Sequence, residues 1–194
     1  MSFEASRFRR LALISLALQS AGHIVGRTKL QKILYLANLC GWNAAEFKYD
    51  NFGPYSETLA KELENMRENG WIEESVESTS KDRIIYNYSL SKKHSQRAIS
   101  LVGKLDEMGE GKLLKKTEGL VKFLNDFDSD NLEIMATLIF LRKQNPSMSI
   151  EDTMKVTKEL KPRFSDGQIS EAGRIFNVMR DFLPPQEAAK ILSK

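Results

Sequence analysis

The sequence predicts a mainly α-helical protein with one small β-hairpin, on three observations. Most of the 194 residues lie in segments whose apolar positions recur every three or four residues, the period of a helix. Residues 71–90 instead alternate apolar and polar on both sides of a polar turn, as a hairpin does. Three helical segments precede this hairpin, which is the order of a winged helix. We therefore expect a winged-helix-like domain over residues 1–108 and a C-terminal helical bundle over residues 112–194, with the boundary at residues 109–111.

The first helix is expected over residues 3–21, with Gly22 at its end. Its apolar run, residues 11–18, follows three arginines and has the outline of a short secretory signal. Eight apolar residues are too few to span a bilayer, however, and Leu11, Ile14 and Leu18 share one helical face. We expect a core helix, in a cytoplasmic protein that does not engage a membrane.

Two further helices precede the hairpin. Thr28 and Gln31 have the spacing of a capping box, which would open a helix that ends before Gly41. Residues 46–52 alternate aromatic and polar side chains and are expected to form a short strand or an extended segment. The Gly-Pro pair at residues 53–54 is expected to start the third helix, because proline is tolerated in a first turn, and residues 69–70 should end it.

The hairpin itself is expected to turn at residues 78–82, and helices follow it. These helices are expected over residues 91–108 and 112–126, and from Asp130, Ser149, Ser165 and Pro184 onward. A serine followed three residues later by Asp152 or Gln168 is a typical helix start.

Composition and motifs argue against several classes of function. Lys+Arg 29 against Asp+Glu 26 leaves a net charge of +3, too even to indicate a nucleic-acid or membrane partner by itself. Cys40 is the single cysteine, and with His23 and His94 it offers too few ligands for a metal centre. We expect Cys40 to be buried and His23 to lie in a loop. The alternating acids at residues 126, 128 and 130 lack the glycine and distal glutamate of a calcium loop. Phosphate-binding and catalytic motifs are also lacking, so neither an enzyme nor a cofactor is expected.

One part of the chain resembles known proteins. The stretches GRTKLQKILYLANLCGW and FKYDNFGPYSETLAKELENMRENGWIEE resemble the YwgA-like and Panacea (SocA-antitoxin-like) proteins. The shared outline is a KLQK-type helix at residues 29–32, an aromatic-rich extended piece at residues 47–54, and a helix closed by glycine and an apolar pair at residues 55–72. The match covers residues 25–90. It implies a winged-helix-like fold, prophage or mobile-element association and, in Panacea members, toxin neutralisation by direct contact. It implies no catalytic residue.

The leading functional hypothesis is therefore a non-enzymatic interaction module, antitoxin- or adaptor-like, which acts by direct protein–protein contact. Its candidate partner-binding residues are Tyr49, Asp50 and Tyr55, because tyrosine combines a large apolar area with a polar tip. The alternative is that the aromatic cluster they belong to is core that fills the space between helices. That cluster comprises Phe47, Tyr49, Phe52 and Tyr55.

A DNA-binding regulator, acting as a homodimer, is the second hypothesis. The expected third helix and the hairpin each carry a net charge of −2, which disfavours phosphate. Residues 1–50 carry a net charge of +4, and their helix ends would form a basic patch if they adjoin. The candidate nucleic-acid-binding residues are Arg7, Arg9, Arg10, Arg27, Lys29 and Lys32. The alternative is a solvated face of snorkelling side chains.

Overall fold

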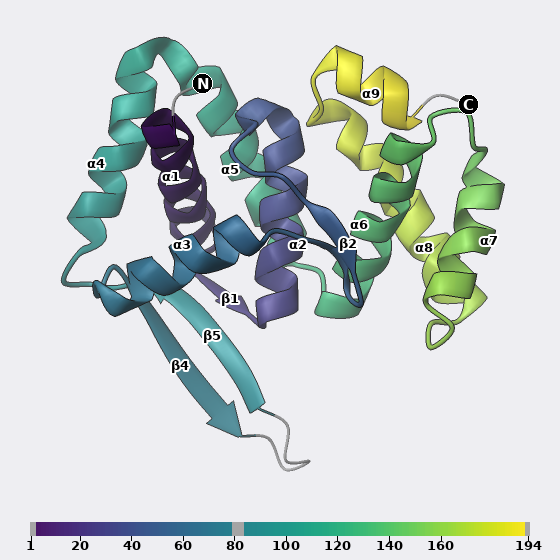
Figure 1. Ribbon diagram of the computed structural model, residues 1–194, viewed down its shortest axis with the longest axis horizontal. Coiled ribbons are helices and arrows are strands. Elements are labelled where there is room, and N and C mark those ends of the chain that lie inside the picture. Colours follow the sequence, from purple (N-terminus) through teal and green to yellow (C-terminus); the bar gives the residue numbers. More distant parts are fainter. Residues whose placement is uncertain (1–2, 79–83, 193–194) are drawn as a thin grey trace.

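The structure is a computed structural model that describes residues 3–78 and 84–192, and it is mainly helical with a small antiparallel sheet (Figure 1). The described elements before the β4–β5 hairpin are α1 (Phe3–Ala21), β1 (His23–Val25), α2 (Arg27–Ala37), the π-helical turn η1 (Asn38–Trp42), β2 (Lys48–Asp50), β3 (Gly53–Tyr55) and α3 (Glu57–Glu68). From the hairpin onward they are β4 (Ile72–Ser78), β5 (Ile84–Leu90), α4 (Ser95–Leu105), the π-helical turn η2 (Asp106–Glu110), α5 (Gly111–Asn125), α6 (Ser129–Gln144), α7 (Ile150–Leu160), α8 (Asp166–Phe176), the 3₁₀ turn η3 (Asn177–Asp181) and α9 (Pro185–Leu192).

Helix α2 occupies the centre of the molecule (Figure 1). Helix α1, α4, α3 and the sheet lie on one side of it, and α6 to α9 lie on the other. The buried apolar residues form one cluster that runs from α1 to α9. Residues 109–111, where we expect a domain boundary, link two helices, α4 and α5, that both pack against α1.

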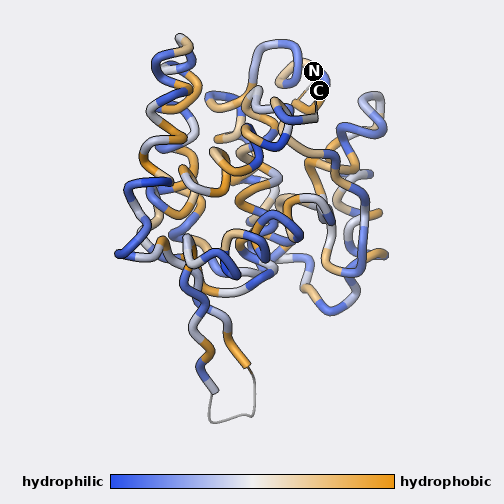
Figure 2. Tube along the Cα trace, turned by 60° about the vertical axis from the view of Figure 1, so that its left-hand side comes forward, coloured by the Kyte–Doolittle hydropathy of each residue, from blue (hydrophilic) through white to orange (hydrophobic). Residues whose placement is uncertain are grey.

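The hairpin is confirmed, and a third strand joins it. Strand β5 lies between β4 and β1, all antiparallel, with Val76 opposite Tyr86 and His23 opposite Ser89. The loop assignment of His23 is therefore wrong. Three residues are too few to show a period of two, and only the burial of Ile24 marks them as part of the fold. The expected turn at residues 78–82 falls, apart from Ser78, outside the described residues. The hairpin projects from the body of the protein (Figure 2).

Helix starts were predictable where a short polar side chain caps the backbone. Ser149 and Ser165 are the N-caps of α7 and α8, and Ser165 forms a complete capping box with Gln168. The start expected at Asp130 is wrong by two residues: Asp128 is the cap, and its carboxylate accepts the Asn131 N–H at 2.8 Å.

The capping box expected at Thr28 is also wrong. Helix α2 begins at Arg27 after Gly26, which has a φ of 101° and no side-chain cap. The Gln31 amide is engaged elsewhere, as described below.

The third helix does not start at the Gly-Pro pair. Residues 53–55 form β3, which pairs with β2 so that Tyr49 lies opposite Pro54. Helix α3 begins two residues later, and the hydroxyl of its N-cap Ser56 accepts the Leu59 N–H at 3.4 Å. Proline suits both contexts, because an edge strand, like a first helical turn, tolerates a missing N–H.

A buried hydrogen bond joins η1, which follows α2, to α5. Trp42 is fully buried, and its indole N–H donates to the Thr117 hydroxyl at 2.8 Å. Thr117→Val keeps the shape but leaves the N–H without an acceptor, so we expect a loss of about 1–3 kcal/mol in the free energy of unfolding. Urea denaturation measures it. Thr117→Ser keeps the acceptor and serves as the control. Equal midpoints for Thr117→Val and the unmodified protein would show that this bond contributes nothing.

Candidate functional site

The polar residues of the KLQK-type helix hold distant segments in place. Lys29 donates to the Asn125 carbonyl at 2.6 Å and Lys32 to the Pro54 carbonyl at 2.8 Å. The Gln31 side chain bonds both backbone groups of Ser56, at 3.2 and 3.3 Å. The two sequence pieces that carry the family resemblance are therefore in direct contact, with the KLQK helix bound to the chain around the Gly-Pro pair.

A buried ion cluster holds the β2–β3 hairpin, which contains the Gly-Pro pair, on the side that faces α6. Glu133 of α6 is 1% exposed, and its carboxylate lies 3.0 Å from Lys161 Nζ and 2.7 Å from Arg163 Nη2. Lys161, also buried, donates to the Asn51 carbonyl in the β2–β3 turn. Gly53 lies against α6 so closely that a Cβ there would be 2.8 Å from the Thr137 hydroxyl. The hairpin thus has little freedom to move.

Sequence reasoning missed this cluster, although a signal was available. Glu133 is the only charged residue within the apolar run of residues 132–141, and Lys32 is followed by the apolar run of residues 33–37. A charged residue in such a position is buried only if it is paired.

The β2–β3 hairpin borders a cleft of about 1010 Å³, and this cleft is the candidate site. The cleft lies among α1, α2, the segment before β2, the start of α3 and the end of α6. All three predicted partner-binding residues, Tyr49, Asp50 and Tyr55, line it. Tyr55 also lines a second cavity of about 220 Å³, which borders Arg27 and α3. The structure therefore brings these three residues to one concave surface.

Aromatic rings form one wall of the cleft. The Tyr35 and Phe47 ring centroids are 5.0 Å apart, and those of Tyr49 and Phe140 are 5.7 Å apart. The hydroxyls of Tyr35 and Tyr49 are buried and, among the described residues, find no hydrogen-bond partner. Tyr49 and Tyr55 are half-buried at the cleft surface, whereas Asp50 is exposed. Phe52, half exposed at the hairpin turn, lies outside the cleft.

The six candidate nucleic-acid-binding residues are not a free basic patch. Arg10, Lys29 and Lys32 are buried, at 8%, 8% and 1% exposure. Arg7 and Arg10 pair with Glu62, and Arg9 bonds the Glu110 carboxylate at 2.8 Å and the Trp42 carbonyl at 2.8 Å. Arg27 stacks on Tyr86 at 3.6 Å and pairs with Glu74. Each of the six therefore already holds two parts of this chain together.

Other candidate features have a structural explanation. Burial raises the pKa of the Cys40 thiol to about 12, so that it stays protonated at neutral pH. Within residues 3–78 and 84–192, no group of three or more His, Cys, Asp or Glu side chains could hold a metal ion. The helices in those ranges include none that is both long and apolar enough to cross a bilayer.

Comparison with known proteins agrees with part of the resemblance. The chain is similar to the uncharacterized protein YwgA of Bacillus subtilis strain 168, with 29% identity over 147 residues. The alignment covers 72% of this chain and 82% of that protein. No family model matches the chain. The similarity supports a YwgA-like relationship that extends over more of the chain than residues 25–90.

The burial of Lys32 predicts a specific pH dependence. Burial lowers the pKa of Lys32 from 10.5 to about 8, and the Lys161 cation lowers it further, against the opposing effect of Glu133 and Asp50. Between pH 8 and 10.5 the unfolded chain keeps a proton that the folded protein has released, so stability increases with pH in this window. Lys32→Met removes the effect. We expect the stability of the unmodified protein relative to the variant to increase by about 3 kcal/mol from pH 8 to 10.5.

Urea denaturation of both proteins at pH 7.5, 9 and 10.5 measures this difference. The other titrating groups are common to both proteins, so their contributions cancel. Parallel pH curves would show that Lys32 keeps an ordinary pKa in the folded state.

Proposed function

We propose that this chain is a non-enzymatic interaction module, antitoxin- or adaptor-like, that binds a segment of a partner protein in the cleft beside the β2–β3 hairpin. The observation that carries the proposal is the convergence of Tyr49, Asp50 and Tyr55 on one cleft of about 1010 Å³.

The chemistry of the cleft suits a peptide segment. The aromatic wall offers apolar area, and Tyr55 can contribute a polar tip, the combination that dominates binding energy at protein interfaces. Charged side chains of both signs, Glu46, Lys48 and Asp50, stand exposed along the segment that borders it. Such a polar rim with an aromatic centre is the usual anatomy of a non-obligate interface.

The anchored hairpin also supports the proposal. Lys32 and Lys161 hold the backbone of β3 and of the β2–β3 turn, so the cleft wall is preorganised before a partner arrives. Binding to a rigid surface loses less conformational entropy than binding to a mobile one.

We propose in addition that the N-terminal part is winged-helix-like, and the order of its elements supports this assignment. Three helices and a three-stranded sheet in the order β1–β5–β4, with a projecting hairpin, are what a winged-helix-like N-terminal part requires. The Panacea resemblance, which rests on residues 25–90, is part of the same proposal.

A pair of variants tests the function. The double variant Asp50→Ala with Tyr55→Ala removes a carboxylate and a phenol from the cleft. We expect the proteins that co-purify with the unmodified chain from its native host to be recovered with this variant in at least tenfold lower amount. The control combines Asp166→Ala with Phe52→Ala, an exposed carboxylate and a half-exposed aromatic outside the cleft. We expect the control to retain those partners.

The fold is checked by circular dichroism and by the melting temperature, which both variants should keep within a few degrees. Tyr49→Phe adds a milder test, because it removes a hydroxyl that has no partner among the described residues and should not destabilise the fold. Equal loss of the partner from the cleft and control variants would place the interface elsewhere, and so would equal retention.

A further inference from the structure

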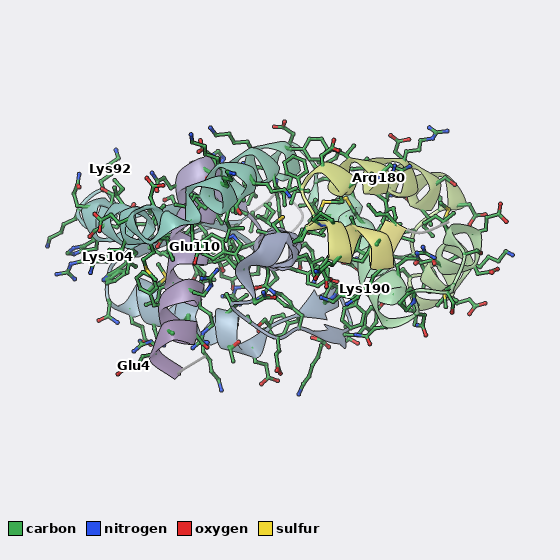
Figure 3. The ribbon with its side chains drawn as sticks, turned by 90° about the horizontal axis from the view of Figure 1, so that it is seen from above. Glu4, Lys92, Lys104, Glu110, Arg180 and Lys190 are labelled. Atoms are coloured by element: carbon green, nitrogen blue, oxygen red, sulfur yellow. The ribbon has the colours of Figure 1, made fainter. Side chains whose placement is uncertain are left out.

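Helix α4 and the turn before it carry four exposed cations that form no ion pair with any described residue. Residues 91–105 contain four basic residues and no acidic one. Arg97, Ser100 and Lys104 follow one another along one side of the helix at spacings of three and four. Lys92 and Lys93 precede the helix, and all four cations are exposed. In Figure 3, Lys92 and Lys104 both lie on the side of the molecule away from Arg180 and Lys190.

The packing of α4 keeps this row on the surface. Ala98 and Leu105 are buried, Leu101 and Val102 are half-buried, and this apolar stripe faces α1. The cations occupy the remaining sides of the helix. Arg97 lies 6.0 Å from the Trp71 ring centroid, which orients its guanidinium without neutralising it.

The contrast with the N-terminal cations is clear. All six of those residues are bound to carboxylates, carbonyls or aromatic groups of this chain. Among the described residues, by contrast, Lys92, Lys93, Arg97 and Lys104 form no ion pair. Two cations on α4 and two in the turn before it are therefore available to an external anion.

The side chains favour a phosphodiester backbone over an acidic protein. Three of the four cations are lysines, which are depleted at protein interfaces but are standard partners of nucleic-acid phosphates. The exposed Gln96 and Ser100 supply uncharged donors of the kind that contact phosphate oxygens. The row is not enclosed by either of the two cavities described above, which suits an extended ligand.

We propose that the exposed row on α4 binds the phosphate backbone of a nucleic acid without reading its sequence. Two cations on α4 and two in the turn before it can contact three or four phosphates. The site is separate from the cleft, and the acidic β4 edge, with Glu73, Glu74 and Glu77, leaves α4 rather than the hairpin as the contact surface.

Fluorescence anisotropy of the full chain with a labelled 20-base-pair duplex, as DNA and as RNA, tests this. We expect a Kd of about 1–100 µM at physiological salt, and log affinity that falls against log salt with a slope of about −3 to −4. Similar binding of both duplexes identifies the shared backbone as the ligand, and a preference for one identifies the nucleic acid. A Kd above about 100 µM for both duplexes at 50 mM salt overturns the proposal.

Matched charge reversals locate the surface. The combination of Lys93→Glu, Arg97→Glu and Lys104→Glu should weaken binding more than tenfold and flatten the salt dependence. The control reverses three exposed cations in the other half of the molecule: Arg174→Glu, Arg180→Glu and Lys190→Glu. Figure 3 shows Arg180 and Lys190 far from Lys92 and Lys104. Because both triple variants change the net charge equally, equal losses would mean a non-local charge effect and overturn the proposal.

Two further arms complete the experiment. If the α4 reversal fails to fold by circular dichroism, the glutamine versions of the same three positions replace it, with a salt slope expected to be less steep by about 3. Poly-glutamate competes as a model of an acidic protein. Displacement of the duplex at a lower charge concentration than unlabelled DNA requires would assign the row to an acidic protein instead.

Discussion

The burial of Lys32 is the constraint on which the rest of this structure depends. Its ammonium group is removed from water between α2, the β2–β3 hairpin and α6, and it is held by the Pro54 carbonyl. A buried charge that loses its partner destabilises a protein by several kcal/mol. The hairpin must therefore stay where Pro54 can accept this hydrogen bond, and that position also defines one wall of the cleft. The KLQK and Gly-Pro pieces of the sequence belong together for this physical reason.

The need to pair buried charges also explains why residues 1–50, although their net charge is +4, do not form a basic surface. Residues 5–45 contain no acidic side chain, so their cations must find carboxylates or carbonyls elsewhere. Arg10 pairs with Glu62 of α3 and Arg9 with Glu110 of η2, contacts of 52 and 101 residues in sequence separation. Long-range pairs of this kind position elements in the fold. The cations of helix α4 form no such ion pairs among the described residues, and the helix packs against α1 through its apolar stripe.

The sequence was informative where a feature is local. The hairpin, the helix that spans Phe3–Ala21 and the serine caps of α7 and α8 follow from periodicity and short-range hydrogen bonds. Predictions from the sequence were wrong where a side chain bonds a residue that is distant in the sequence. Gln31 is predicted to cap its own helix but bonds Ser56, and Glu133, a single charge in an apolar run, pairs with Lys161. The residues predicted to bind a partner line one cleft, as their closeness in sequence allows. The buried charges beside that cleft are held by tertiary contacts, which the periodicity of a sequence does not reveal.

Helix α1 relates the two proposed surfaces to each other. Arg10 lines the cleft, while the neighbouring Arg9 bonds Glu110 at the junction of α4 and α5. The central part of α1 is almost wholly buried between these elements, from Ala12 to Leu18, so it transmits position with little freedom to bend. Helix α1 therefore contacts both the cleft and the η2 turn that follows α4. The two proposed surfaces share no residue, because the cleft is lined by none of Lys92, Lys93, Arg97 and Lys104.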